Sequence, residues 1–108
     1  MAGAAILVLT QLPDLASAQA LARALVEARL AACVSVGAPV ESLYHWRGQI
    51  ETATEVPVVV KTRAARYAEV EAAIRARHPY ELPEILAVPV LDGFAPYLDW
   101  LAAETRDH

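Results

Sequence analysis

The stretch Val40–Thr62, VESLYHWRGQIETATEVPVVVKT, decides the fold that we predict for this chain. Two extended runs flank Arg47-Gly48-Gln49, where the glycine is available for the positive φ of a tight turn. Upstream, Cys33–Val36 is predicted to be a strand, which Gly37-Ala-Pro39 separates from the first run as a bulge or kink. The sequence therefore predicts a long β-hairpin.

The predicted hairpin is too long for a domain of this size. With the upstream strand from Cys33 counted in, each arm has about 13–15 residues, against a usual five or six, and would span more than about 40 Å at ~3.3 Å per residue. A domain of 108 residues is only about 25–30 Å across. The tip must therefore bend over or project, and a projecting ribbon exposes edges that pair with other chains. A hydrophobic content of 56%, above the usual ~45–50%, agrees with this prediction of a homo-oligomer.

The elements outside the hairpin each carry a start or stop signal. They are a buried strand over 4–10, a helix capped by Asp14, a helix capped by Thr62 and ended by His78-Pro79, an edge strand over 84–90 that contains Pro89, and a short last helix that contains Pro96. The order β-α-β-β-α-β plus a C-terminal helix predicts a single α+β domain over residues 1–108. Its expected arrangement is ferredoxin-like, an antiparallel sheet with helices on one face.

Charge and hydropathy argue against several classes of partner. The net charge is −4 and the nine Lys and Arg residues are scattered, so no positive stripe for nucleic acid or for anionic membranes is expected. The apolar run 4–9 is too short to span a bilayer and lacks the features of a signal peptide. A single cysteine, Cys33, cannot form an internal disulfide. We therefore expect a cytoplasmic protein.

Segments spread over nearly the whole chain resemble the CutA1 (divalent-cation tolerance) family in order and spacing. They are Pro13-Asp14, Leu30-Ala-Ala-Cys-Val34, Tyr44-His-Trp-Arg-Gly-Gln-Ile-Glu51, Lys61-Thr62, His78-Pro-Tyr-Glu-Leu-Pro-Glu84 and Tyr97-Leu-Asp-Trp-Leu101. The Tyr-x-Trp-x-Gly turn and the His-Pro-Tyr-Glu-x-Pro-Glu segment are the most specific of these. The resemblance implies a ferredoxin-like subunit in a homotrimer, with the hairpins adding strands to neighbouring subunits. It also implies a role in divalent-cation tolerance, and some members of the family bind copper.

Candidate metal ligands are few. Cys33 and His78 are soft or borderline donors of the kind that copper prefers, and Glu81 and Glu84 are harder donors near His78. None of them falls in a dedicated ligand spacing such as Cys-x-x-Cys. We predict a site for copper or another divalent cation on these four side chains, against the alternative that the carboxylates are simply solvated.

The resemblance also implies where copper would bind. Copper-binding members of the family use a cysteine just after the first strand and two adjacent histidines before the Pro-Tyr pair. The matching positions here are Thr10, Arg77 and His78. Because one of three ligands remains and Arg77 adds a positive charge, we expect tight copper binding at this place to be lost.

Three further features have both a structural and a functional interpretation. Tyr44 and Trp46 lie two residues apart and face the same side of the ribbon, where we predict a subunit interface rather than ligand stacking. Lys61, the only lysine, could attract an anion at a strand end. Two prolines make segment 78–84 rigid, so it either delivers the last strand or forms a pocket edge in which His78 and Tyr80 contact a ligand.

Enzymatic motifs are missing from the sequence. It contains neither a glycine-rich phosphate loop nor a Gly-x-Ser-x-Gly elbow, and no nucleophile–base pair is recognisable. The leading hypothesis is a trimeric binding or regulatory protein linked to metal tolerance. The alternative is a trimeric small-molecule sensor of the PII-like type with ligand in the clefts between subunits. A third hypothesis is an enzyme that uses His78 and Glu81 as an acid–base pair.

Overall fold

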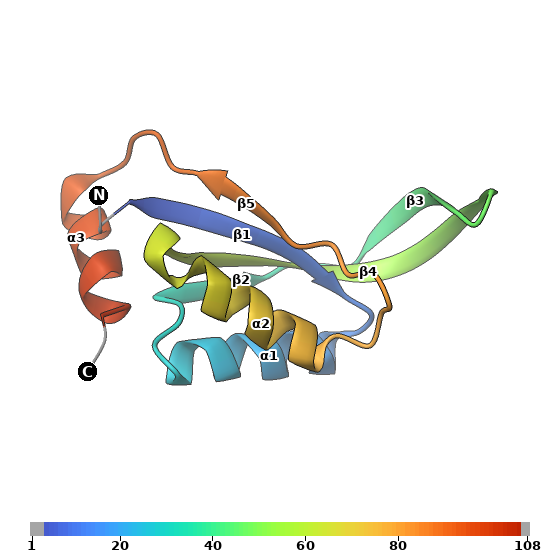
Figure 1. Ribbon diagram of the computed structural model, residues 1–108, viewed down its shortest axis with the longest axis horizontal. Helices are drawn as coiled ribbons and strands as arrows, with labels where there is room; N and C mark the ends of the chain where they lie inside the picture. Colours follow the sequence, from blue (N-terminus) through green and yellow to red (C-terminus); the bar gives the residue numbers. More distant parts are fainter. Residues whose placement is uncertain (1–3, 107–108) are drawn as a thin grey trace.

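The computed structural model of the chain describes residues 4–106. The predicted order of strands and helices is confirmed (Figure 1). The elements are β1 (Ala5–Leu12), α1 (Leu15–Glu27), β2 (Cys33–Val36), β3 (Val40–Trp46), β4 (Gln49–Arg63), the 3₁₀ turn η1 (Ala64–Arg66), α2 (Tyr67–Arg77), β5 (Leu86–Pro89) and α3 (Ala95–Glu104).

The sheet has the strand order β2-β4-β1-β5, and all its neighbouring strands are antiparallel. β4 is long enough to pair with β2 and β1 in the sheet and with β3 beyond it. β5 lies at one edge, where Ile6 is paired with Pro89, as the missing N–H of proline requires. The α+β arrangement with an antiparallel sheet is thus confirmed.

Helices α1 and α2 lie side by side on one face of the sheet (Figure 1). The core forms there because alternate residues of β1 and β4 point at the helices, among them Val8 and Val60. These strands meet Leu21 of α1 and Ile74 of α2, all of them fully buried. Within residues 4–106 no helix covers the opposite face of the sheet, and the edge strand β5 is exposed throughout. This face is therefore left uncovered, with Leu86 and Val88 of β5 exposed on it.

Local capping explains where the helices begin. The Asp14 carboxylate caps α1 as predicted, accepting a hydrogen bond of 2.7 Å from the backbone N–H of Ser17. This bond lowers the pKa of the carboxyl group. The prediction that Thr62 caps the second helix is wrong, because β4 continues to Arg63. Thr62 is buried, and its hydroxyl donates to the Leu30 carbonyl at 2.7 Å.

The hairpin projects as its length predicts (Figure 1). The molecule measures 45 × 26 × 23 Å, and β3 pairs with β4 beyond the sheet. The two-residue turn places Arg47 at φ 52° and Gly48 at φ 79°, the left-handed conformation that a tight hairpin turn needs. At the base of the hairpin, a Cβ on Gly37 would lie 2.9 Å from the Pro57 side chain. A larger residue at position 37 would therefore push β2 away from β4.

Helix α3 closes one end of the molecule and is held at its C-terminus by arginines of β4 and η1. The Arg63 Nε donates to the Thr105 hydroxyl at 2.9 Å, and the Arg66 Nε donates to the Thr105 carbonyl at 2.8 Å. The second bond satisfies a carbonyl group that the helix end leaves unpaired. Over residues 4–106, no helix is long and apolar enough to cross a membrane.

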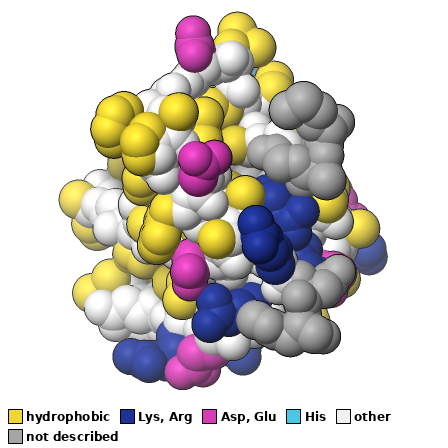
Figure 2. All heavy atoms as spheres, turned by 90° about the vertical axis from the view of Figure 1, so that its left-hand side faces the viewer, with side chains coloured by type: hydrophobic (Ala, Val, Ile, Leu, Met, Phe, Trp, Pro, Cys, Tyr) yellow, Lys and Arg dark blue, Asp and Glu magenta, His cyan; other side chains and the backbone are white. Residues whose placement is uncertain are grey.

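Exposed hydrophobic side chains gather at the α3 end of the molecule. Figure 2 shows this end, where they alternate with acidic groups and lie beside a cluster of basic side chains. They include Phe94, Tyr97 and Trp100, and the rings of the last two are 5.4 Å apart. Leu91, just before α3, is almost completely exposed. So much uncovered apolar surface is unusual in a monomer.

Candidate functional site

A cleft of about 870 Å³ lies between the projecting hairpin and the segment that leads into β5. Residues 42–46 of β3 and Glu55 of β4 form one wall, and residues 80–86 form the other. The hairpin supplies a rigid wall because both its strands are paired along their whole length. Pro83 stiffens the opposite wall by fixing φ and removing a backbone donor.

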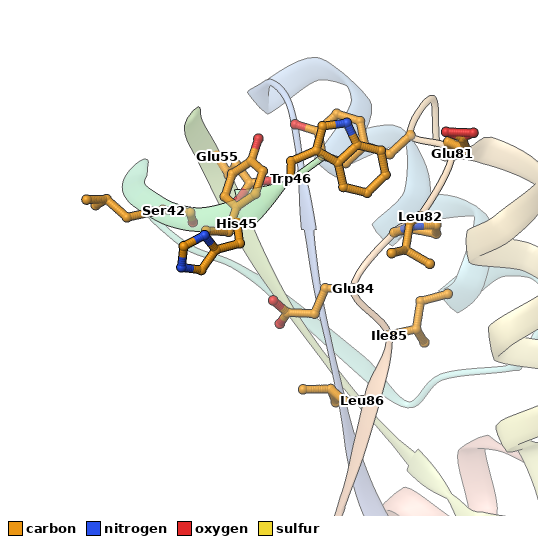
Figure 3. Close-up of a pocket in the computed structure, with 13 residues that line it drawn as sticks. Ser42, His45, Trp46, Glu55, Glu81, Leu82, Glu84, Ile85 and Leu86 are labelled. Carbon is orange, nitrogen blue, oxygen red and sulfur yellow. The ribbon is translucent and has the colours of Figure 1, made fainter. Parts of the chain in front are cut away.

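The side chains on the hairpin wall follow from the register of β3 and β4. Val40 lies opposite Glu55 and Tyr44 opposite Glu51, so the even-numbered residues of β3 share a face with Glu55. Figure 3 shows Trp46 pointing across the cleft toward Glu81, whereas His45 points away. Tyr44 and Trp46 thus face this chain's own segment 80–86. Their predicted role in a subunit interface stays a prediction.

Arg47, at the hairpin tip, bridges the mouth of the cleft. Its Nη2 lies 3.4 Å from a carboxylate oxygen of Glu81, and its guanidinium carbon lies 5.5 Å from the centre of the Trp46 ring. The guanidinium therefore rests between an aromatic face and a carboxylate. Because both charged side chains are more than two-thirds exposed, solvent screens the pair and it holds the cleft only weakly closed.

The interior of the cleft combines a buried carboxylate with a phenol. Glu55 is 9% exposed, which is rare for a carboxylate. Burial, the charge of Glu55, hydrogen bonding to that carboxylate and the nearby Tyr44 together raise the pKa of the Tyr80 phenol. At neutral pH the phenol is thus a hydrogen-bond donor beside a negative charge.

His78 lies behind the cleft as a joint between three parts of the chain. It is 8% exposed and follows the last turn of α2. Its Nε2 lies 2.6 Å from the Gln11 carbonyl, and its Nδ1 accepts a hydrogen bond of 3.2 Å from the Tyr80 N–H. These partners require the neutral tautomer with the proton on Nε2. Both ring nitrogens are therefore occupied by the backbone.

The four predicted metal ligands do not meet in this chain. Glu81 and Glu84 line the cleft, His78 is turned to the backbone, and Cys33 lies on β2, at the opposite edge of the sheet from β5. Within residues 4–106, no group of three or more His, Cys, Asp or Glu side chains is placed to hold a metal ion. A metal site built on these residues stays a prediction that needs a donor from another subunit.

The remaining candidates lie apart from the cleft. Lys61 of β4 pairs with Cys33, and its Nζ is 3.2 Å from the Ser35 hydroxyl and 3.8 Å from the Cys33 sulfur. The predicted anion site at Lys61 is not tested by this arrangement. Thr10 is buried on the helix-facing side of β1, and Arg77 is exposed at the end of α2.

Among the charged groups of the cleft, sequence reasoning missed Glu55 in the wall and Arg47 at the mouth. Glu55 follows from the turn, because the pairing that Arg47-Gly48 sets puts Glu55 on the same face as Tyr44 and Trp46. The register signal was therefore present in the sequence. No sequence pattern, however, predicts that segment 80–86 bends back against this face.

The whole domain, including both walls of this cleft, has known relatives. The profile of the CutA1 divalent ion tolerance protein family matches residues 6–104, nearly the entire chain. The chain belongs to the CutA1 family. The resemblance inferred from the hairpin turn and from segment 78–84 is thus confirmed.

Individual CutA proteins match over most of this chain. The divalent-cation tolerance protein CutA of Pectobacterium atrosepticum is 40% identical over 102 residues, which cover 94% of this chain and 93% of that protein. The crystal structure of CutA from Xylella fastidiosa superposes with a TM-score of 0.91 at 40% identity, covering 94% of this chain and 98% of the other. The CutA1 structure from Thermus thermophilus gives a TM-score of 0.92 at 38% identity, with coverage of 94% and 99%.

Proposed function

We propose that this CutA1-family protein is a homotrimer, joined through its hairpin, that serves divalent-cation tolerance as a binding component rather than as a catalyst. The observation that carries the proposal is the projecting hairpin with an uncovered outer face. Leu43 and Ile50 lie on that face, at 65% and 69% exposure. An exposed apolar face beside an unpaired strand edge favours association with a second copy of the chain.

Assembly is supported by further apolar surface outside the hairpin. Leu86 and Val88 of β5 are exposed on the sheet edge, and the outer edges of β3 and β5 both lack a strand partner in the described chain. Edge-to-edge pairing between copies would satisfy the unpaired backbone groups of both strands. A cytoplasmic location is part of the proposal, because the single cysteine fits a reducing compartment.

A charge on the outer face of the hairpin tests the assembly. Ile50→Glu should lower the mass measured by light scattering, because burying a carboxylate between copies is costly. Gln49→Glu is the matched control: it adds the same charge at an exposed position of the same hairpin but on the opposite face, because Gln49 is paired with Trp46, and it should leave the mass unchanged. A trimer that survives Ile50→Glu and Leu43→Glu together would place the interface elsewhere.

Metal binding is tested separately, by melting curves with divalent cations. A cation that binds the folded trimer raises the melting midpoint in proportion to RT ln(1 + [L]/Kd). Copper should act only weakly, because Thr10 and Arg77 stand where the family's copper ligands are expected. An unchanged midpoint with every divalent cation, on a sample of trimeric mass, would contradict the metal-binding part of the proposal.

The cleft favours a second candidate function, a small-molecule sensor. Its volume of about 870 Å³ falls within the ~300–1,000 Å³ of typical ligand sites. It mixes aromatic and aliphatic walls with a few charged groups, as such sites do. The engagement of both His78 ring nitrogens by the backbone argues against the third hypothesis, an acid–base pair with Glu81. Turnover that depends on His78 would revive that hypothesis.

A further inference from the structure

We propose that the cleft binds a small alkylguanidinium, held between the aromatic rings of Tyr44, Trp46 and Tyr80 and the carboxylates of Glu55 and Glu81. The proposal rests on the sensor function above and deepens it, because it assigns a ligand class to the same cleft. It follows from the charge of the cleft, from its aromatic content and from a cation that the chain itself places at the mouth.

The cleft is negatively charged. Glu55, Glu81 and Glu84 line it, and no Lys or Arg belongs to its described walls. The Arg47 guanidinium at the mouth offsets part of this charge. Carboxylates set in low-dielectric walls concentrate their field within a cleft and attract cations into it. A free anionic ligand is therefore disfavoured.

The arrangement suits an organic cation better than a bare metal ion. Divalent ions need several oxygen donors that converge on one point, and no such group exists in the described chain. The faces of the three aromatic side chains attract weakly hydrated cations. A guanidinium also forms two parallel hydrogen bonds with a carboxylate. Both kinds of partner are present on the cleft walls.

Arg47 shows what the cleft accepts. Its guanidinium carbon lies 5.5 Å from the centre of the Trp46 ring, and its Nη2 lies 3.4 Å from the Glu81 carboxylate. It thus uses one aromatic ring and one carboxylate of the five groups named above. Because the Arg47 side chain is 75% exposed, the contact is weak enough for a ligand to displace it. We infer that Arg47 competes with the ligand from within the same chain.

Calorimetric titration with butylguanidinium tests this inference, with butylurea as the uncharged probe of similar shape. Butylguanidinium should bind with a Kd on the order of 1 mM, as its size allows, and butylurea should bind at least tenfold more weakly. Glu81→Gln should weaken butylguanidinium about three-fold and Arg47→Gln should tighten it about three-fold. Glu41→Gln, outside the cleft, should change nothing.

Three results would overturn the proposal. Equal binding of the two probes would show that charge has no part in recognition, and no heat with either probe would show that the cleft is not a site for this class. Tighter binding of an acetylated Gly-Arg-Gly amide than of butylguanidinium, by tenfold or more, would assign the cleft to a protein arginine instead. The mass of each sample distinguishes a failure of this ligand proposal from a failure of the proposed trimer. Loss of the trimer would lower the mass but would leave the preference for butylguanidinium over butylurea unchanged.

Discussion

At the scale of single residues, His78 connects elements that are far apart in the sequence. Its imidazole contacts the end of β1 through Gln11 and the start of the cleft segment through Tyr80, and its ring lies 4.6 Å from the Tyr80 ring. Tyr80 is thus positioned in the cleft by a histidine that has no free nitrogen. His78 therefore positions Tyr80 in this chain, and its predicted role as a metal ligand stays a prediction.

Replacement of His78 should therefore affect stability more than metal binding. His78→Ala leaves the part-buried Gln11 carbonyl and Tyr80 N–H without these partners and should lower the free energy of unfolding by about 2 kcal/mol. His45→Ala, whose side chain points away from the cleft (Figure 3), is the control and should change it little. Denaturant unfolding at a fixed protein concentration measures both. Unchanged stability together with a loss of copper binding would show that His78 is a ligand.

Thr10 gives a prediction of the opposite sign. Its hydroxyl is buried, and within the described residues it has no hydrogen-bond partner. Thr10→Val replaces the hydroxyl by a methyl group of similar size and should raise the free energy of unfolding by about 1 kcal/mol. Thr10→Ser keeps the hydroxyl, loses the methyl group and should lower it. A less stable Thr10→Val protein would mean that a bound water or ligand uses the hydroxyl.

The raised pKa of the Tyr80 phenol determines how the stability of the protein should change at alkaline pH. Because burial and Glu55 raise the pKa of the phenol in the folded state, its contribution to stability is complete below the unfolded pKa of ~10 and is lost as the pH rises through the folded value. Stability should thus fall above pH ~10, and less so in Tyr80→Phe. Ultraviolet titration of phenolate in both proteins measures the group directly. A Tyr80 phenol that ionises below pH ~10 would contradict this picture of the cleft.

At the scale of elements, the hairpin was the most predictable part of the chain. Its turn signal and extended runs depend on neighbouring residues, so the sequence alone predicts both strands. The turn is one residue shorter than predicted, because Gln49 already belongs to β4 and is paired with Trp46. The start of α2 was not predictable, because the Thr62 hydroxyl donates a hydrogen bond to the Leu30 carbonyl on an adjacent segment and does not cap the helix. The cleft was not predicted either, because it also depends on contacts between distant segments. It depends on how segment 80–86 lies against the hairpin, which no local pattern encodes.

The turn at the hairpin tip can be tested by one pair of substitutions. Gly48 has a φ of 79°, so Gly48→Ala should lower the free energy of unfolding by about 1 kcal/mol. Arg47 has a φ of 52°, and Arg47→Asn should raise it slightly, because asparagine tolerates this conformation better. Thermal unfolding of the two variants measures the difference. Equal midpoints would show that the tip does not hold its turn in solution.

At the scale of the whole molecule, the described chain covers one face of its sheet with helices and leaves the other face uncovered. The helices bury one side of the sheet, whereas β5, the hairpin and the surroundings of α3 expose large apolar side chains. Family membership was predictable from motifs because they are local and ordered along the chain. What covers the open surface was not, because no local pattern encodes it; the proposed trimer assigns this role to other copies of the chain.

Sedimentation equilibrium of the unmodified protein at micromolar concentration tests the central claim most directly. The proposed assembly predicts a single species whose mass is three times the 11.6 kDa of one chain, stable on dilution because the exposed apolar surfaces of the hairpin and sheet are then shared between copies. A mass near that of one chain, with the hairpin exposed to solvent, would contradict it.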